Sequence, residues 1–150
     1  MVIQRVQTLY LLLSIAFMTA FFFLPFGYIK EVDGATAAQA LQPLTGLSGL
    51  GFIIPTSVCI FLTLMAIFLF KALPTQKLFV VLAALISLAE AVMVVYALVE
   101  RYVSTDPTVH DSVVWGGGGL LLIAAIILDI AAYRSISRDQ RLLRSYDRLR

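Results

Sequence analysis

Long apolar runs alternate with short polar stretches along this chain of 150 residues. Four of the runs are long enough to cross a hydrocarbon core of about 30 Å as helices, because a helix rises about 1.5 Å per residue. They lie at about residues 6–24, 50–70, 78–98 and 113–133. The pattern predicts an all-α fold, an integral membrane four-helix bundle that occupies residues 1–133.

The composition points the same way. Hydrophobic residues make up 61% of the chain and charged residues 13%, whereas an average soluble domain is about 25% charged. The polar stretches between the runs are too short to hold a separate soluble domain, so we expect no enzyme. The first run is too long for the apolar part of a usual signal peptide, and we expect it to remain as an anchor.

Basic residues are distributed unevenly over the two ends of the predicted bundle. Only Lys30 and Arg101 fall at one end, and the other end holds Arg5, Lys71, Lys77, Arg134, Arg138, Arg141, Arg144, Arg148 and Arg150. Short segments rich in Lys and Arg stay in the cytoplasm. We therefore expect the N-terminus and the C-terminus to be cytoplasmic.

Residues 134–150 are predicted to form a separate, basic amphipathic helix in the cytoplasm. At about 100° per residue, one arc holds Arg134, Arg138, Arg141, Arg144 and Arg148, and the opposite side is mostly apolar. Two interpretations stay open: the arginines contact anionic lipids of the inner leaflet, or they contact a partner protein. Asp139 falls on the apolar side, so we expect it to meet a donor from Gln4 or Arg5 of the first helix, or from a partner.

A single acid, Glu90, interrupts the middle of the third run. It lies one turn from Ser87 on a face of small residues, which is typical of a helix contact in membranes. Hydroxyls expected near its depth are those of Thr56 and Ser57 on the second run and Thr19 on the first. Glu90 could be a neutral carboxyl hydrogen-bonded in that contact, a proton or ion site, or a residue that faces water.

A second acid, Asp129, lies close to the inner boundary of the fourth run. Arg5, at the start of the first run, is expected at the same level. We predict an Asp129–Arg5 ion pair at the inner rim, with exposure of Asp129 to interfacial water as the alternative. Glu90 and Asp129 differ by about 12 Å in predicted depth, so we do not expect them to share one proton or one ion.

Known catalytic and cofactor motifs are not found. Cys59 is the only cysteine and His110 the only histidine, so the chain offers no disulfide and no clustered metal ligands. The glycine run in "WGGGGL" lacks the Lys and Ser/Thr that follow a phosphate-binding loop, and we expect it to allow close helix approach. We expect no cofactor, no metal and no nucleic-acid partner.

The opening "MVIQRVQTLYLLL" and the closing "SRDQRLLRSYDRLR" resemble an uncharacterised family of small four-span bacterial inner-membrane proteins. The residues concerned are Ile3, Gln4, Arg5, Val6, Gln7 and Thr8, and then Arg144, Ser145, Asp147, Arg148, Leu149 and Arg150. The resemblance implies the bacterial inner membrane and implies no activity.

Two functions are compatible with these observations. The first is a non-catalytic accessory or scaffolding subunit of a larger membrane complex, which docks through its basic C-terminal helix. The second is a minimal ion- or proton-coupled transporter that uses Glu90. Expected partners are anionic lipids of the cytoplasmic leaflet and other inner-membrane proteins, or further copies of this chain.

Overall fold

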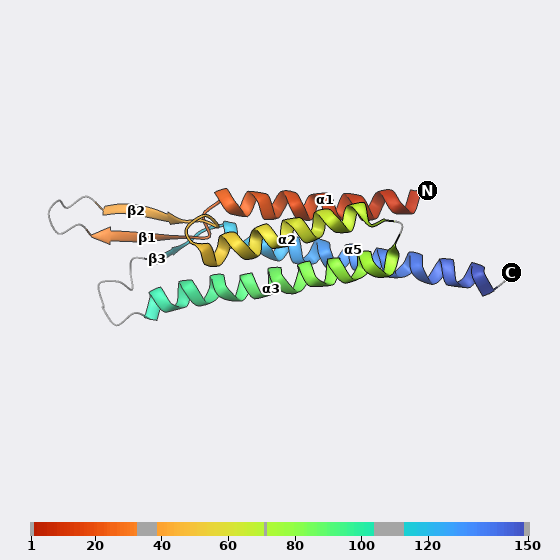
Figure 1. The fold of residues 1–150 in the computed structure, drawn as a ribbon. Helices are drawn as coiled ribbons and strands as arrows, with labels where there is room; N and C mark the ends of the chain where they lie inside the picture. The colour runs from red at the N-terminus through yellow and green to blue at the C-terminus, as the bar shows by residue number, and fades with distance from the viewer. Residues whose placement is uncertain (1, 33–38, 71, 104–112, 149–150) are drawn as a thin grey trace.

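The computed structural model describes residues 2–32, 39–70, 72–103 and 113–148. Its elements follow in the order α1 (Val2–Phe23), β1 (Gly27–Val32), β2 (Gln39–Leu44), α2 (Leu50–Phe68), α3 (Leu73–Val103), β3 (Val113–Trp115) and α5 (Gly118–Arg148). The four helices lie alongside one another in an elongated bundle (Figure 1). The strands lie at one end, the sheet end, and both chain termini lie at the other, the terminal end.

Each helix packs against two others. α1 lies against α2 and α5, and α3 lies against the same two helices. Successive helices therefore run in opposite directions around the bundle, an up-and-down arrangement. The predicted bundle of four long apolar helices is confirmed.

The interior is built from positions spaced three or four residues apart on every helix. This spacing keeps one face of a helix against its neighbours when helices cross at a small angle. The buried positions are Gln7, Leu11, Ser14, Met18 and Phe21 in α1; Thr56, Cys59, Thr63 and Ala66 in α2; Gln76, Val80, Ala83, Ser87, Glu90, Val94 and Leu98 in α3; and Leu122, Ala125, Asp129, Ala132, Ile136 and Asp139 in α5.

The outward faces are apolar as well. Leu9, Leu85 and Ile127 are 61%, 57% and 60% exposed. All four helices are long and apolar enough to cross a membrane, over Val6–Phe23, Leu50–Phe68, Leu73–Glu100 and Gly118–Leu142. Such helices indicate a multi-pass membrane protein, because a surface of this kind is suited to lipid and not to water.

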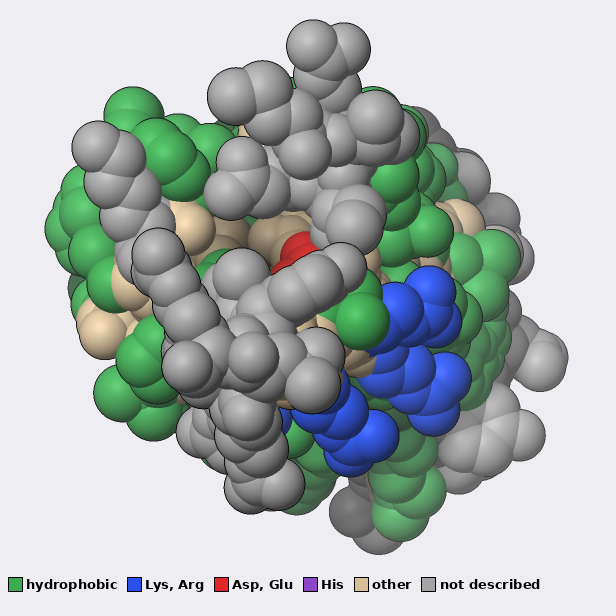
Figure 2. Space-filling model, turned by 90° about the vertical axis from the view of Figure 1, so that its right-hand side faces the viewer, with side chains coloured by type: hydrophobic (Ala, Val, Ile, Leu, Met, Phe, Trp, Pro, Cys, Tyr) green, Lys and Arg blue, Asp and Glu red, His purple; other side chains and the backbone are tan. Residues whose placement is uncertain are grey.

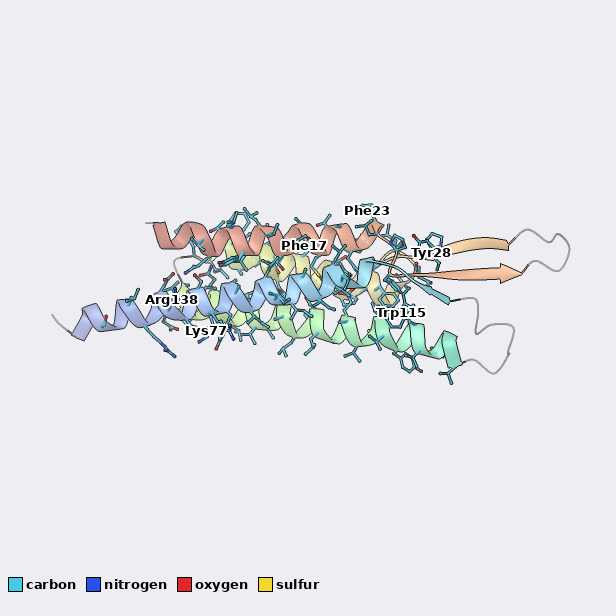
Figure 3. The ribbon with its side chains drawn as sticks, turned by 180° about the vertical axis from the view of Figure 1, so that it is seen from behind. Phe17, Phe23, Tyr28, Lys77, Trp115 and Arg138 are labelled. Carbon is cyan, nitrogen blue, oxygen red and sulfur yellow. The ribbon has the colours of Figure 1, made fainter. Side chains whose placement is uncertain are left out.

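The ends of the bundle differ in chemistry. Figure 3 shows Phe23, Tyr28 and Trp115 near the sheet end, and Lys77 and Arg138 near the terminal end. Phe21, Phe26 and Phe52 pack together inside the sheet end, with ring centroids 5.7 Å and 5.2 Å apart for the successive pairs. Aromatic rings therefore close the interior at that end.

A three-stranded antiparallel sheet joins the helices at the sheet end, where a loop was predicted for the segments that form β1 and β2. Its strand order is β2-β1-β3. Gly27 in the central strand pairs with Leu44 on one side and with Trp115 on the other. β3 takes the first residues of the predicted fourth span, so the fourth helix begins at Gly118 and not at Val113.

Two of the four consecutive glycines allow the start of α5 to approach the end of α1. Gly116 N donates to Phe26 O and Gly118 N donates to Pro25 O, each at 2.9 Å. A β-carbon on Gly116 would lie 2.2 Å from Pro25 O, which no side chain can tolerate. Gly117 has nothing within 4 Å of such an atom. The expectation of close approach thus applies to Gly116 and Gly118.

The boundary predicted between the bundle and a tail helix at residue 133 has no counterpart in the fold. α5 runs unbroken from Gly118 to Arg148. Ile136 is 0% exposed and Asp139 9% exposed, so the buried face of the fourth helix continues beyond residue 133. Residues 134–150 were predicted to form a surface helix with one apolar side. At Ile136 and Asp139 that side packs inside the bundle.

Candidate functional site

A group of buried polar side chains lies in the middle of the bundle, and we call it the central polar cluster. None of its members is more than 1% exposed. It contains Ser14 of α1, Thr56, Cys59 and Thr63 of α2, Ser87 and Glu90 of α3, and Asp129 of α5. All four helices therefore contribute to it.

The hydroxyl of Thr56 is the described hydrogen-bond partner of Glu90. Thr56 Oγ1 donates to Glu90 Oε1, and the same hydroxyl lies 2.7 Å from Phe52 O. Glu90 Oε2 is buried and has no hydrogen-bond partner within the described part of the chain. The α2–α3 contact expected for Glu90 is therefore present, but it uses only one of the two carboxyl oxygens.

Cys59 extends the cluster along α2. Its Sγ lies 3.0 Å from Ser87 Oγ, and Ser87 also donates to Ala83 O at 3.0 Å. Thr63 donates to Cys59 O at 2.9 Å. Hydroxyl and thiol groups thus follow one another from the level of Glu90 toward the terminal end.

Asp129 faces Ser14 across the α1–α5 contact. The two side chains are close enough to interact, but the geometry makes no hydrogen bond, and both Asp129 oxygens lack a partner among the described residues. Ser14 lies nine residues beyond Arg5 in α1, about 13 Å along the axis. The side chain of Arg5 lies outside the described part of the structure, so the Asp129–Arg5 ion pair stays a prediction.

Apolar layers enclose the central polar cluster at both of its ends. Toward the terminal end, Leu11, Val80, Ala132 and Ile136 are at most 1% exposed and form one core cluster. Toward the sheet end, Phe21, Phe26, Val94 and Leu98 belong to another. No Lys, Arg or His is found among the buried residues that the structure describes, so the two acids are enclosed without a cation.

Two of the hydroxyls expected near Glu90 lie elsewhere. Thr19 is exposed and donates to Ile15 O of its own helix at 2.8 Å. Ser57 is exposed, although its neighbour Thr56 is buried. Depth along the sequence gave the correct turn of α2, and the direction of the side chain decided that Thr56, and not Ser57, reaches the carboxyl.

Asp139 forms a second buried polar contact nearer the terminal end. Gln7 Nε2 donates to Asp139 Oδ2, and Oδ1 has no partner among the described residues. A donor from the first helix or from a partner protein was predicted. The donor described is Gln7, which lies one helical turn from Gln4. The side chains of Gln4 and Arg5 lie outside the described part.

Basic side chains gather on one side of the terminal end. Figure 2 looks onto this end and shows Lys and Arg side chains to one side of an acidic side chain. Arg134, Arg138 and Arg141 are exposed. The side chains of Arg144 and Arg148 lie outside the described part, so the predicted basic arc is described only over its first three members.

Gln7, Ser14 and Thr63 were not predicted to be interior residues, and Cys59 was predicted only as a lone thiol. A signal was present, because Gln7 and Ser14 are seven residues apart, as are Thr56 and Thr63. Polar residues that recur every seven positions in an apolar helix lie on one face.

No group of three or more metal-ligating side chains occurs in residues 2–32, 39–70, 72–103 and 113–148.

Comparison with curated proteins found no match. A model of one protein family, described as a domain of unknown function (DUF4293), matches residues 3–149. Since the match covers nearly the whole chain, the protein belongs to this family of unknown function, DUF4293.

Proposed function

We propose that the protein is a proton-coupled carrier of the bacterial inner membrane, with both termini in the cytoplasm and separate proton-binding groups at Glu90 and at Asp129. The four apolar helices support the membrane location, and the basic terminal end supports the orientation. One observation carries the proposal. Two carboxyl groups are enclosed at the centre of the bundle, and three of their four oxygens have no hydrogen-bond partner among the described residues.

A purely structural role would leave those oxygens without a hydrogen bond to any of the described residues. Polar side chains that hold membrane helices together do so through hydrogen bonds, and a buried oxygen without a donor contributes no such bond. An ionised acid at the centre of a membrane helix costs roughly 2.5–3.5 kcal/mol even on lenient scales. Proton binding removes that charge and supplies a donor, so a proton is the ligand best suited to the site.

The contacts of Thr56 support a protonated Glu90. A hydroxyl has one proton to donate, yet Thr56 Oγ1 contacts both Phe52 O and Glu90 Oε1. If Glu90 carries a proton and donates it to Thr56, then Thr56 is free to donate to Phe52 O. Both contacts are then satisfied, whereas an ionised Glu90 would compete with Phe52 O for one proton.

Enclosure of the site supports a carrier and not a channel. Sites of secondary transporters lie near the middle of the membrane and open alternately to the two sides. The apolar layers on both sides of the central polar cluster correspond to an occluded form, and a metal cation would need more oxygen ligands than the carboxyl of Glu90 finds here.

The test measures proton uptake by proteoliposomes that contain a pH-sensitive dye, together with the infrared carbonyl band of protonated carboxyl groups. Glu90→Gln should fold, lose the contribution of Glu90 to that band and abolish uptake. Glu100→Gln, at an exposed position of the same helix, is the matched control and should change neither. Normal uptake by a folded Glu90→Gln protein would overturn the proposal.

Stability provides a second readout. Glu90→Leu removes one hydrogen bond, worth about 0.6 kcal/mol on average between membrane helices, and also removes an oxygen without a partner. We expect its free energy of unfolding to stay within about 1 kcal/mol of the parent protein. A loss of several kcal/mol in both the Leu and Gln variants would instead assign Glu90 a structural role.

An accessory subunit is the second candidate, and the exposed basic face of α5 favours it. Arg134, Arg138 and Arg141 point away from the interior, while Ile136 and Asp139 face it. Replacing the three arginines by Gln leaves the interior intact. If the protein docks through them, proteins that co-purify with it in mild detergent should be lost from this variant and kept in Glu90→Gln.

A further inference from the structure

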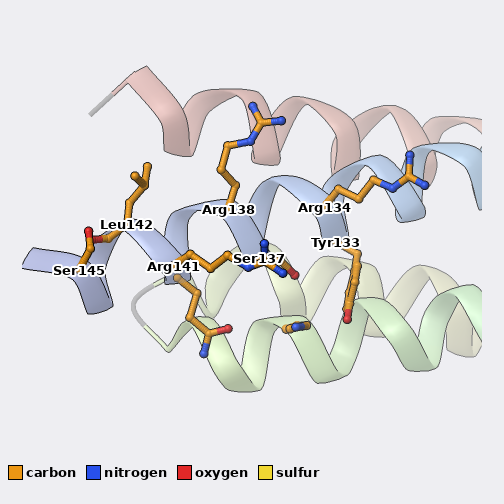
Figure 4. A pocket seen from close by; sticks show the side chains of 9 residues that line it. Tyr133, Arg134, Ser137, Arg138, Arg141, Leu142 and Ser145 are labelled. Carbon is orange, nitrogen blue, oxygen red and sulfur yellow. The ribbon is translucent and has the colours of Figure 1, made fainter.

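A basic groove lies between α3 and α5 at the terminal end. Its volume is about 800 Å³, and the side chains of Lys77, Arg134, Arg138 and Arg141 line it together with hydroxyl groups. No acidic residue is among the described residues that line it. Figure 4 shows Arg134, Arg138 and Arg141 arising from successive turns of α5. The groove is therefore strongly cationic, and an anion is the ligand that suits it.

The polar groups of the groove are available to a ligand. Ser137 Oγ is buried but has no hydrogen-bond partner within the described part. Lys77 Nζ lies 4.5 Å from the centre of the Tyr133 ring, a contact that holds the ammonium group at the edge of the groove without neutralising its charge. A phosphate there would meet hydroxyl and amino donors as well as guanidinium groups.

A second, apolar groove continues from the basic one toward the middle of the bundle. It has a volume of about 420 Å³ and shares Tyr133 and Arg134 with the basic groove. Val80, Ala84 and Leu88 line it on α3, and Ile126 and Ile130 line it on α5. From Val80 to Leu88 it extends about 12 Å along the helix, which is long enough for part of an acyl chain.

The basic groove suits the anionic headgroup of a phospholipid, and the apolar groove suits one of its acyl chains. We propose that the two grooves hold a single anionic phospholipid, its phosphate near Lys77 and Arg141 and one acyl chain between α3 and α5. The inference rests on the proposed membrane location and is independent of proton binding. A protein partner would leave the apolar groove unexplained, because that groove lies among residues of the membrane-spanning windows of both helices.

Asp129 is the acidic residue that lines the apolar groove. Asp129 is 0% exposed to solvent, so its side chain lies at the floor of the groove and not at its rim. A hydrocarbon chain over it is compatible with a neutral carboxyl and unfavourable for an ionised one. The bound lipid would therefore shield the central polar cluster from the side.

The test uses the purified full-length protein and native mass spectrometry with two lipids that share the same acyl chains. Dioleoyl phosphatidylglycerol, which is anionic, should be retained, and dioleoyl phosphatidylcholine, which has no net charge, should not. Lys77→Gln with Arg141→Gln should weaken retention about thirtyfold, if each cation contributes about 1 kcal/mol. Lys30→Gln, in β1 at the sheet end, is the charge control and should have no effect.

A second pair of variants tests the apolar groove. Ala84→Phe fills it and should also reduce retention of phosphatidylglycerol at least tenfold, whereas Ala89→Phe, at an exposed position of the same helix, should not. If Ala84→Phe fails to fold by circular dichroism, Ala84→Leu replaces it. Equal retention of both lipids, or full retention by the folded Ala84 variant, would overturn the proposal. Stabilisation by inorganic phosphate equal to that by phosphatidylglycerol would also overturn it, in favour of a free-anion site.

Discussion

A β-carbon added at Gly118 would lie 2.5 Å from the carbonyl oxygen of Leu24. Backbone atoms of the segment that follows α1 cannot move aside as a flexible side chain can, so Gly118→Ala must shift the start of α5. We expect it to lower the free energy of unfolding by about 1–3 kcal/mol, measured as a lower thermal midpoint in detergent. Gly117→Ala, where nothing lies within 4 Å, is the matched control and should stay within about 0.5 kcal/mol of the parent. Equal effects would show that the chains do not approach as described.

The surroundings of Glu90 were predictable only in part. The small residues near Glu90 indicated a helix contact, and counting turns indicated Thr56 as a possible donor. The sequence could not choose between Thr56 and Ser57, since adjacent residues point about 100° apart and the choice depends on the rotation of α2. That rotation is fixed by the packing of all four helices, which no single run of residues specifies.

At the scale of elements, the four helices were predictable and the sheet was not. Helices that cross a membrane need long apolar runs, and these are visible at once. The strands are short, "GYIKEV" and "QALQPL", and show no regular alternation. "VVW" of β3 is apolar and adjoins a helix, so it read as part of the fourth span. Pairing between segments so far apart in the chain, such as Gly27 with Trp115, leaves no local pattern.

The continuation of α5 beyond residue 133 gives a prediction about the α1–α5 contact. Gln7 and Asp139 are buried and hydrogen-bonded to each other, so removal of either leaves the other without its partner. Gln7→Ala and Asp139→Ala should therefore be non-additive in thermal stability, with a coupling of about 1 kcal/mol. The matched cycle pairs Ser14→Ala with Asp139→Ala; Ser14 lies two turns from Gln7, and these effects should add. Additivity in both cycles would mean that Gln7 and Asp139 do not meet.

At the scale of the whole molecule, the two ends of the bundle differ in the kinds of ligand that they could bind. The sheet end is closed by aromatic rings and short strands, and the terminal end exposes arginines beside a basic groove. If the central polar cluster takes up protons and the groove holds an anionic lipid, then the groove must lie in one particular leaflet. Both proposals therefore depend on which end faces the cytoplasm.

The orientation can be tested with cysteine labelling, because Cys59 is buried at 0% exposure and is the only cysteine. In a Cys59→Ala background, Leu47→Cys places a thiol at the sheet end and Ser145→Cys places one at the terminal end; both positions are exposed. Basic segments stay in the cytoplasm, so an impermeant maleimide added to intact spheroplasts should label position 47. Position 145 should react only after the membrane is permeabilised. The reverse pattern would place the basic groove in the outer leaflet and reverse the side from which the carboxyl groups of the cluster receive protons.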